Sequence, residues 1–418
     1  MKFKFNLTVQ IFLAMGLGVL VGLLVHNHLP SDPEAELPLY FDLIVLVGDI
    51  FMKLLRMIIV PLIMASIIMG VVSIGDLSKL GRVGGKTFTY YFGSTFLAVI
   101  VGLIVVNLVK PGVGFPTQGE PLEQVTENEP PSFLEIIEDI VPTNIFAAMA
   151  ESDVLSLIFF SLIFGAVLTT LRDKAKGMIG FFEALNHVMM KLTDWIMRIA
   201  PIGIFALIAK LFATVDAGQT LGPLLKYMLS VVGGLLIHAV ITLPLLLWIF
   251  ARYSPLKFFS KMLAAITTAF STASSAATLP VTMECLQDNV GVSKRTTSFV
   301  LPLGATINMD GTALYESIAA LFIAQMYGIE LTLTQQCVVF LTATLASIGA
   351  AAIPSAGLFT IVIVLEAVNF PAEQIAVGLG IIYGVDRILD MFRTAVNVWG
   401  DSVGATVVAR LEGETLKA

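Results

Sequence analysis

The sequence predicts an all-α, polytopic membrane protein with inverted repeats in its second half. Of the 418 residues, 57% are hydrophobic and 13% are charged, and the mean hydropathy is +0.90. Soluble domains carry charge on about a quarter of their residues. Apolar runs recur along the chain, and about 20 such residues cross a hydrocarbon core of about 30 Å. In the second half, polar residues interrupt this background in an order that repeats.

The first half contains most of the expected spans. The first run lacks a small-residue cleavage site, so we expect it to remain as a span rather than to be removed as a signal peptide. The expected spans lie near residues 9–27, 40–72, 87–109, 140–171, 178–213 and 221–250, and a less regular region follows.

Loop charges predict the orientation. Lysine and arginine collect near residues 79–86, 172–176, 252–261 and 294–295, and such loops remain cytoplasmic. The segment 111–139 instead contains seven acidic residues and no lysine or arginine, which is typical of a flexible external loop. We therefore expect a multi-pass protein of the cell (inner) membrane with both termini in the cytoplasm.

The segment Asn308-Met309-Asp310-Gly311-Thr312 is the strongest functional signal. It lies in a largely apolar stretch, where an amide, a carboxylate and a hydroxyl need partners other than lipid. A glycine beside the acid frees the backbone, whose carbonyls can then coordinate a cation. The segment predicts an ion site within a broken helix.

A structural unit is repeated around this segment. The small-residue run 271–280 ends at a proline and precedes the span with Asn308 and Asp310, and a second such run, 346–357, precedes another polar span. One span separates the two units, so they enter the membrane from opposite sides, as in transporters whose sites lie at a repeat interface. Each run is expected to form the tip of a re-entrant hairpin, although ordinary helix packing by small residues is the alternative.

The last span suggests the substrate. Asp386, Asp390, Arg393, Asn397 and Asp401 recur every three or four residues and share one helical face. The arginine fork suits a carboxylate, and Asp390 is placed to hold an ammonium group. Together they match a zwitterion with an acidic side chain. The alternative is a purely structural Asp390–Arg393 ion pair.

Other functions find little support in the sequence. A net charge of −7 argues against nucleic-acid partners, and Cys285 and Cys337 lack a redox spacing. The stretch 81–87 resembles a phosphate-binding loop but follows no strand and lacks the first glycine. The four histidines show no metal spacing beyond a weak loop pair. Gly18 and Gly22 form a GxxxG pattern, which predicts close helix packing.

Four motifs together resemble the dicarboxylate/amino acid:cation symporter family, which includes the excitatory amino-acid (glutamate/aspartate) transporters. They are the serine-rich run 271–280, NMDGT at 308–312, SIGAAAIPSAG at 347–357 and DRILDMFRTAVNVWGD at 386–401, in the order found in that family.

The resemblance implies eight transmembrane segments plus two re-entrant hairpins, a homotrimer, and an elevator mechanism of alternating access. It implies a scaffold of residues 1–82 and 140–213, the external loop 111–139, and a mobile transport domain of residues 83–110 and 214–418.

The resemblance also implies ligands, matched residue by residue. Asp390 would bind the amino group and Arg393 the side-chain carboxylate of the substrate. All the implied substrate ligands are Ser274, Ser275, Thr312, Gly357, Asp390, Arg393, Thr394 and Asn397. The implied sodium ligands form three sets: Asn308, Asn397, Asp401 and the Gly304 carbonyl; Thr306, Met309, Ser347, Ile348 and Ala350; and Tyr91, Ser94, Thr95, Asn308 and Asp310.

The chain departs from the family pattern at two positions. Archaeal members carry an arginine where this chain has Ala273, and animal members carry one where it has Met391; Arg387, on the same helical face, is the candidate substitute. Glu316 matches the proton-carrying glutamate of the animal branch. We hypothesise that Glu316 and Arg387 form a pair that adds proton coupling; a static pair, or an Arg387 that extends to the membrane surface, is the alternative.

The sequence thus predicts a sodium-coupled symporter of acidic amino acids, embedded in the bilayer, and not an enzyme. A proton-coupled C4-dicarboxylate symporter or a neutral amino-acid symporter is the alternative function, and an anion channel is a further one. An intramembrane aspartyl protease is disfavoured because its Gly-x-Gly-Asp signature is absent.

Overall fold

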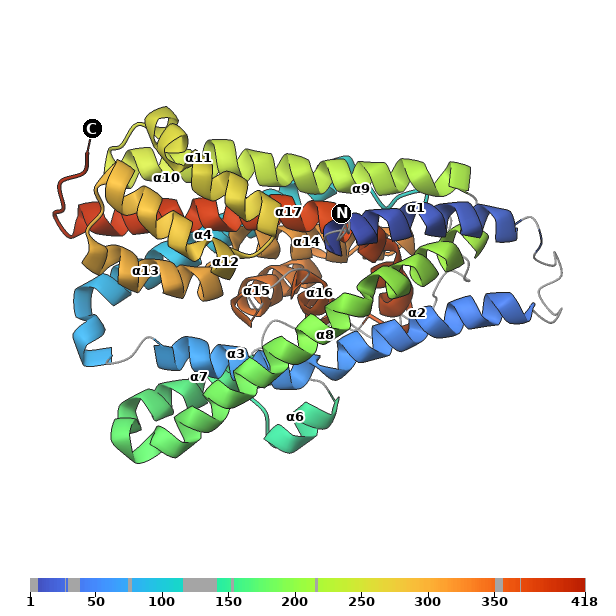
Figure 1. The fold of residues 1–418 in the computed structure, drawn as a ribbon, viewed down its shortest axis with the longest axis horizontal. Coiled ribbons are helices and arrows are strands. Elements are labelled where there is room, and N and C mark those ends of the chain that lie inside the picture. Colours follow the sequence, from blue (N-terminus) through green and yellow to red (C-terminus); the bar gives the residue numbers. More distant parts are fainter. Residues whose placement is uncertain are drawn as a thin grey trace, which may run out of the picture.

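The computed structural model describes residues 7–26, 28, 38–73, 77–115, 141–151, 154–214, 217–349, 356–368 and 370–417. All the regular structure among these residues is helical, and most helices run along the long axis of the molecule (Figure 1). Three helices, and a fourth if one bent pair is counted, are long and apolar enough to cross a bilayer in this part of the chain.

Helices of the first half form one packing group. α8 is its centre and contacts the first three helices, while α7 lies against α3 (Figure 1). The predicted GxxxG packing is confirmed, because a Cβ added to Gly22 would lie 2.7 Å from the carbonyl oxygen of Ala209 on α8. The group consists of α1 (Leu7–His26), α2 (Leu39–Met57), α3 (Ile59–Ser73), α6 (Ile145–Glu151), α7 (Val154–Leu171) and α8 (Lys176–Thr214).

Two expected spans are broken by prolines. The run 40–72 divides at Ile58 into α2 and α3, and α8 bends by 51° between Ile196 and Arg198. Proline lacks an N–H, and its ring clashes with the carbonyl four residues earlier. Pro61 and Pro201 lie four residues after Met57 and residue 197, which explains both positions. The run 140–171 likewise contains two helices, α6 and α7.

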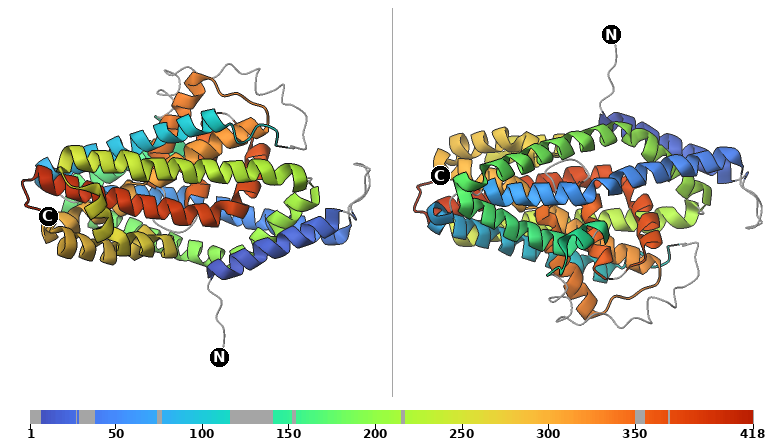
Figure 2. Two further views of the ribbon diagram at one scale, coloured as in Figure 1. Left: turned by 90° about the horizontal axis from the view of Figure 1, so that it is seen from above. Right: turned by 90° about the horizontal axis from the view of Figure 1, so that it is seen from below.

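The remaining helices surround α14. This helix packs against α4, α9, α15, α16 and α17, and nearly all its side chains are buried. Figure 2 shows α17 (red) running beside α9 for much of its length. The group consists of α4 (Leu77–Val109), α9 (Ala217–Ile237), α10 (Leu243–Leu246), α11 (Pro255–Thr272), α12 (Ser275–Glu284), α13 (Lys294–Ile307), α14 (Asp310–Met326), α15 (Leu333–Gly349), α16 (Ala356–Glu366) and α17 (Ala372–Leu411). The described residues also contain one 3₁₀ turn, η2 (Arg172–Ala175), before α8, and three π-helical turns: η3 (His238–Thr242), η4 (Leu247–Ala251) and η5 (Cys285–Val290).

The first small-residue run forms the tip of a helical hairpin. α11 ends at Thr272, Ala273 adopts a left-handed conformation (φ 49°), and Ser274 caps α12, which packs back on α11. In the second run, α15 ends at Gly349 and packs against α16, which begins at Ala356; residues 350–355 lie outside the described residues. Re-entry of these hairpins into a membrane remains a prediction.

Candidate functional site

The helix predicted to be broken is interrupted at Asn308 and Met309. Both have non-helical backbone angles, and α14 begins at Asp310. Gly311 was expected to free the backbone for cation binding, but it lies inside α14. A Cβ at Gly311 would lie 2.7 Å from the carbonyl oxygen of Arg393, so the glycine lets α17 approach.

The carboxylate of Asp310 is fully buried and contacts α4. Its Oδ1 accepts hydrogen bonds from the hydroxyl groups of Thr95 (2.7 Å) and Ser94 (3.1 Å). The Ser94 hydroxyl is also 3.2 Å from Asn308 Oδ1. Four members of the third implied sodium set therefore lie together. The fifth, Tyr91, contacts the group through its backbone, because the Ser94 hydroxyl lies 3.2 Å from the Tyr91 carbonyl oxygen, while the Tyr91 hydroxyl donates to the Val300 carbonyl at 2.8 Å.

A second buried acid lies on the other side of Asn308. The Asn308 amide donates to Asp401 Oδ1 at 2.9 Å. Gly304 is next to this contact, because a Cβ there would lie 2.5 Å from the same oxygen and against the Tyr91 hydroxyl. Three members of the first implied set thus meet. The fourth, Asn397, accepts the Gly311 N–H at 2.7 Å, and its amide is 3.3 Å from the Thr312 hydroxyl.

The second implied sodium set is not brought together by hydrogen bonds of the described residues. Thr306 donates to the Leu303 carbonyl at 3.0 Å, and Ser347 to the Thr344 carbonyl at 3.0 Å. Met309 Sδ is 3.3 Å from the Asn397 amide. The Ile348 side chain and the whole of Ala350 lie outside the described residues, and this set stays a prediction.

Arg393 is the centre of a buried charge cluster on α17. Its Nη2 is 2.7 Å from Asp390 and 3.2 Å from Asp386, and its guanidinium lies 3.9 Å from the ring centroid of Tyr315. The Tyr315 hydroxyl donates to Asp386 at 2.7 Å. The structure therefore contains the Asp390–Arg393 pair, and only 1% of the Arg393 side chain is exposed.

Two donors of Arg393 remain without a protein acceptor. Nε and Nη1 are buried, and among the residues that the structure describes neither has a hydrogen-bond acceptor. Gly357 lies against Nη1, and a Cβ there would also be 3.3 Å from the Thr312 side chain. Thr394 is buried on the same helix. Because a buried unpaired donor is costly, this edge of the fork is the place where an anionic group would be accepted.

The serines of the first hairpin have local contacts. The Ser274 hydroxyl accepts the Ala277 N–H at 3.2 Å, and Ser275 is buried in the first turn of α12. Their implied role as substrate ligands remains a prediction.

Glu316 and Arg387 contact different residues. The Glu316 carboxylate is fully buried and accepts a hydrogen bond from Thr360 through Oε1, and its Oε2 has no partner in the part of the chain that the structure describes. Arg387 lies 3.5 Å from Asp390. A pairing of Glu316 with Arg387 is not among the ion pairs of the described side chains, so it stays a prediction.

Sequence reasoning missed His238, Tyr315 and Thr360. His238 is fully buried in η3, and its Nε2 is 3.3 Å from Asp310 Oδ2. It lies 72 residues from Asp310 in a long apolar run. A histidine in such a run was the only available signal, because ionisable residues inside spans are expensive and often functional.

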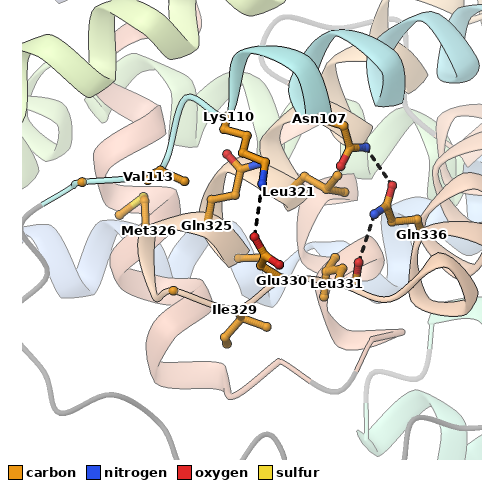
Figure 3. A pocket seen from close by; sticks show the side chains of 13 residues that line it. Asn107, Lys110, Val113, Leu321, Gln325, Met326, Ile329, Glu330, Leu331 and Gln336 are labelled. Atoms are coloured by element: carbon orange, nitrogen blue, oxygen red, sulfur yellow. Dashed lines mark hydrogen bonds and ion pairs between the residues drawn. The ribbon is translucent and has the colours of Figure 1, made fainter.

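The cavity of Figure 3 lies elsewhere. It has a volume of about 520 Å³ at the far end of α14, where Lys110 meets Glu330 at 3.2 Å and Asn107 donates to Gln336. None of the predicted site residues lines it. The Lys110–Glu330 pair is exposed, and such pairs contribute little.

Comparison with known proteins identifies the family. The model of the sodium:dicarboxylate symporter family matches residues 7–411. Excitatory amino acid transporter 2 of Rattus norvegicus is 39% identical, over 96% of this chain and 78% of the relative. Excitatory amino acid transporter 3 of Homo sapiens is 38% identical, over 97% and 85%, and a putative sodium-dependent excitatory amino acid transporter of Caenorhabditis elegans is 37% identical, over 94% and 88%. The chain therefore belongs to the sodium:dicarboxylate symporter family, and it is a multi-pass membrane transporter rather than an enzyme.

Proposed function

We propose that this chain takes up acidic amino acids, aspartate or glutamate, by symport with Na⁺. The observation that carries the proposal is the buried fork of Arg393, two of whose N–H donors, beside Gly357 and Thr312, find no acceptor in the described part of the chain. A substrate carboxylate would satisfy both donors, and a neutral side chain would leave them buried and unpaired.

The neighbouring acids suit an amino group. Asp386 and Asp390 together balance Arg387 and Arg393, so the cluster carries no formal net charge. An ammonium group near Asp390 would replace part of the attraction that Asp390 gives to Arg393 Nη2. This argument favours an amino acid over a C4-dicarboxylate, which has no cation to offer.

The coupling ion would bind in the break between α13 and α14. Asp310 and Asp401 lie on either side of Asn308, surrounded by hydroxyl and carbonyl oxygens. Oxygen ligands with a carboxylate are those that hard cations prefer. The backbone break also releases carbonyl groups that a continuous helix would use internally. Sodium is named in the family and in one relative.

Transport would follow an elevator cycle in a homotrimer. The packing of α1, α2, α3, α7 and α8 as one group, and of α4 and α9–α17 as another, supports the division into scaffold and transport domain. The proposed boundary needs one adjustment, because residues 82 and 83 lie within the continuous helix α4, which begins at Leu77. Eight spans, two re-entrant hairpins and cytoplasmic termini in the cell membrane belong to the same proposal.

Proton coupling through Glu316 is a second part of the proposal. A fully buried carboxyl with one hydroxyl partner is costly to keep charged, which favours its crossing the membrane with a proton. Since Arg387 contacts Asp390 here, the Glu316–Arg387 pair would have to form in another step of the cycle.

Uptake by proteoliposomes tests the proposal against its rivals. The purified chain should accumulate labelled L-aspartate when an inward sodium gradient is imposed, and excess L-glutamate should compete. Preference for succinate under a pH gradient would favour a proton-coupled dicarboxylate symporter, and preference for serine a neutral amino-acid symporter. Anion current without saturable uptake would favour a channel.

A further inference from the structure

His238 is held at a defined place by α17. The π-helical turn η3 begins at this residue. Such turns are rare in proteins, and those that occur are often found at functional sites. A π-turn leaves a carbonyl without its usual helical partner, and the Trp399 indole N–H donates to the Ala239 carbonyl at 3.0 Å. The side chain of His238, fully buried, is thereby presented toward the break between α13 and α14.

His238 contacts the one oxygen of Asp310 that α4 does not. Oδ1 accepts from Ser94 and Thr95, whereas Oδ2 has His238 Nε2, at 3.3 Å, as its one donor among the described side chains. The carboxylate oxygen accepts, so the hydrogen must be on Nε2, and Nδ1 has no partner among the described residues. On the remaining side, α17 closes the space, because a Cβ at Gly400 would lie 2.8 Å from Oδ2.

We infer that His238 is a positioning residue for cation binding: its Nε2–H fixes the plane of the Asp310 carboxylate and so directs Oδ1 to the cation site. The inference rests on the proposed function, because it assumes that Asp310 binds Na⁺. His238 itself would not touch the ion. A carboxylate without this donor would rotate or retain a buried unpaired oxygen, and a metal ligand that is not held in place binds more weakly.

The test measures the sodium concentration that gives half-maximal L-aspartate binding to the purified full-length protein. His238→Leu should raise this concentration by about tenfold, the usual effect of losing a hydrogen bond to a charged group. Aspartate affinity at saturating sodium should be unchanged. His238→Gln places an amide N–H near the position of Nε2 and should restore the parent value. His238→Asn places its amide near Nδ1, out of reach of Asp310, and should behave as His238→Leu.

Two comparisons separate positioning from general stability. In an Asp310→Asn background, His238→Leu should cause no further shift in the sodium midpoint, because the two residues act through one interaction. His187→Gln is the matched control, since this histidine is exposed on α8, where its Nδ1 is 2.8 Å from the Glu183 carbonyl oxygen, and the change should leave the midpoint unchanged.

Three outcomes would overturn the inference. They are an unchanged midpoint in His238→Leu, equal midpoints in His238→Gln and His238→Asn, and a further shift in the Asp310→Asn background. If His238→Leu does not fold, the comparison of the Gln and Asn variants decides. Aspartate binding that ignores sodium in the parent protein would instead remove the proposed function itself, and the two failures are therefore distinct.

Discussion

The N–H groups of the Arg393 guanidinium have two different environments. Nη2 contacts Asp386 and Asp390, while Nε and Nη1 are buried and have no acceptor among the described side chains and backbone groups. Because a buried unpaired donor is costly, this division favours a ligand-binding role. The interval of three or four residues along 386–401 predicted the shared face correctly. It could not predict Tyr315, which lies on α14 and closes the cluster from the opposite side.

Replacing Arg393 should change the substrate range. Arg393→Thr removes the fork and should weaken aspartate binding by about 2–5 kcal/mol, because the substrate carboxylate would then be buried without its cation and beside two acids. Serine or alanine uptake should be gained or retained. Competition of unlabelled amino acids against labelled substrate in proteoliposomes measures both. Arg198→Thr, at an exposed pair on α8, is the control. Undiminished aspartate affinity in Arg393→Thr would refute the assignment.

Asp310 should act through sodium. Asp310→Asn keeps the size of the side chain but removes the charge that attracts the cation, so aspartate binding should require about 5- to 30-fold more sodium, equivalent to about 1–2 kcal/mol. Titrating sodium at fixed aspartate, followed by calorimetry, gives the midpoint. A loss of aspartate affinity that saturating sodium does not recover would argue for a structural role only.

Glu316 should determine the response to protons. Glu316→Gln retains an amide that can contact Thr360 but cannot carry a proton across the membrane. Uptake should therefore lose its dependence on an imposed pH gradient and keep its dependence on sodium. Flux with each gradient alone gives the answer, and an identical pH response in the parent and the variant would contradict proton coupling through this residue.

At the scale of elements, local sequence predicted helices better than their interruptions. The broken helix at Asn308 was predictable because polar groups inside an apolar run require a special backbone. The breaks at Ile58 and near residue 197 were missed although Pro61 and Pro201 are visible in the sequence, since a proline within a span can also be tolerated. The π-turn at His238 leaves no local pattern, because its stabilising contact comes from Trp399 on a distant helix.

The C-terminal segment after α17 contacts both α4 and the N-terminus of α13. Glu412 contacts Arg82 and Lys86 of α4, and Glu414 accepts hydrogen bonds from Ser293 and Thr296 at the start of α13. The guanidinium of Arg82, followed by the Lys86 amine, lowers the pKa of Glu412 from 4.5 to about 2. Partial burial raises the pKa of Glu414, but the hydroxyls of Thr296 and Ser293 lower it more, and the net shift is downward.

The contacts of Glu412 and Glu414 with α4 and α13 should weaken in acid. A carboxyl whose pKa is lowered by folding stabilises the fold above its ordinary pKa of 4.5 and loses that contribution as the pH falls toward about 2. At neutral pH, Glu414→Gln should reduce the protection of the α13 N-terminus by about 1 kcal/mol, since an amide accepts fewer hydrogen bonds than a carboxylate. Hydrogen exchange of residues 293–297 measures the change. Glu330→Gln, at an exposed ion pair, is the control. Equal protection in both variants would contradict the claim that Glu414 stabilises the N-terminus of α13.

At the scale of the whole molecule, the buried charge cluster of α17 lies beside α14, which the helices of the second packing group enclose. The lipid-facing surface needs no polar residues, so composition alone indicated a membrane protein. Which helices pack together was not predictable from hydropathy, because all spans look alike in apolar content. The resemblance to a family supplied the division into scaffold and transport domain, and the contacts of α8 and α14 support it.

The central claim is that a sodium gradient drives accumulation of an acidic amino acid through the site formed by α13, α14 and α17. Its most direct test is uptake of labelled L-aspartate into proteoliposomes with sodium outside and choline inside. The account predicts concentrative uptake that collapses when sodium is equalised, is lost in Arg393→Thr, and needs more sodium in Asp310→Asn. Accumulation that is the same with and without a sodium gradient, or that survives in Arg393→Thr, would contradict it.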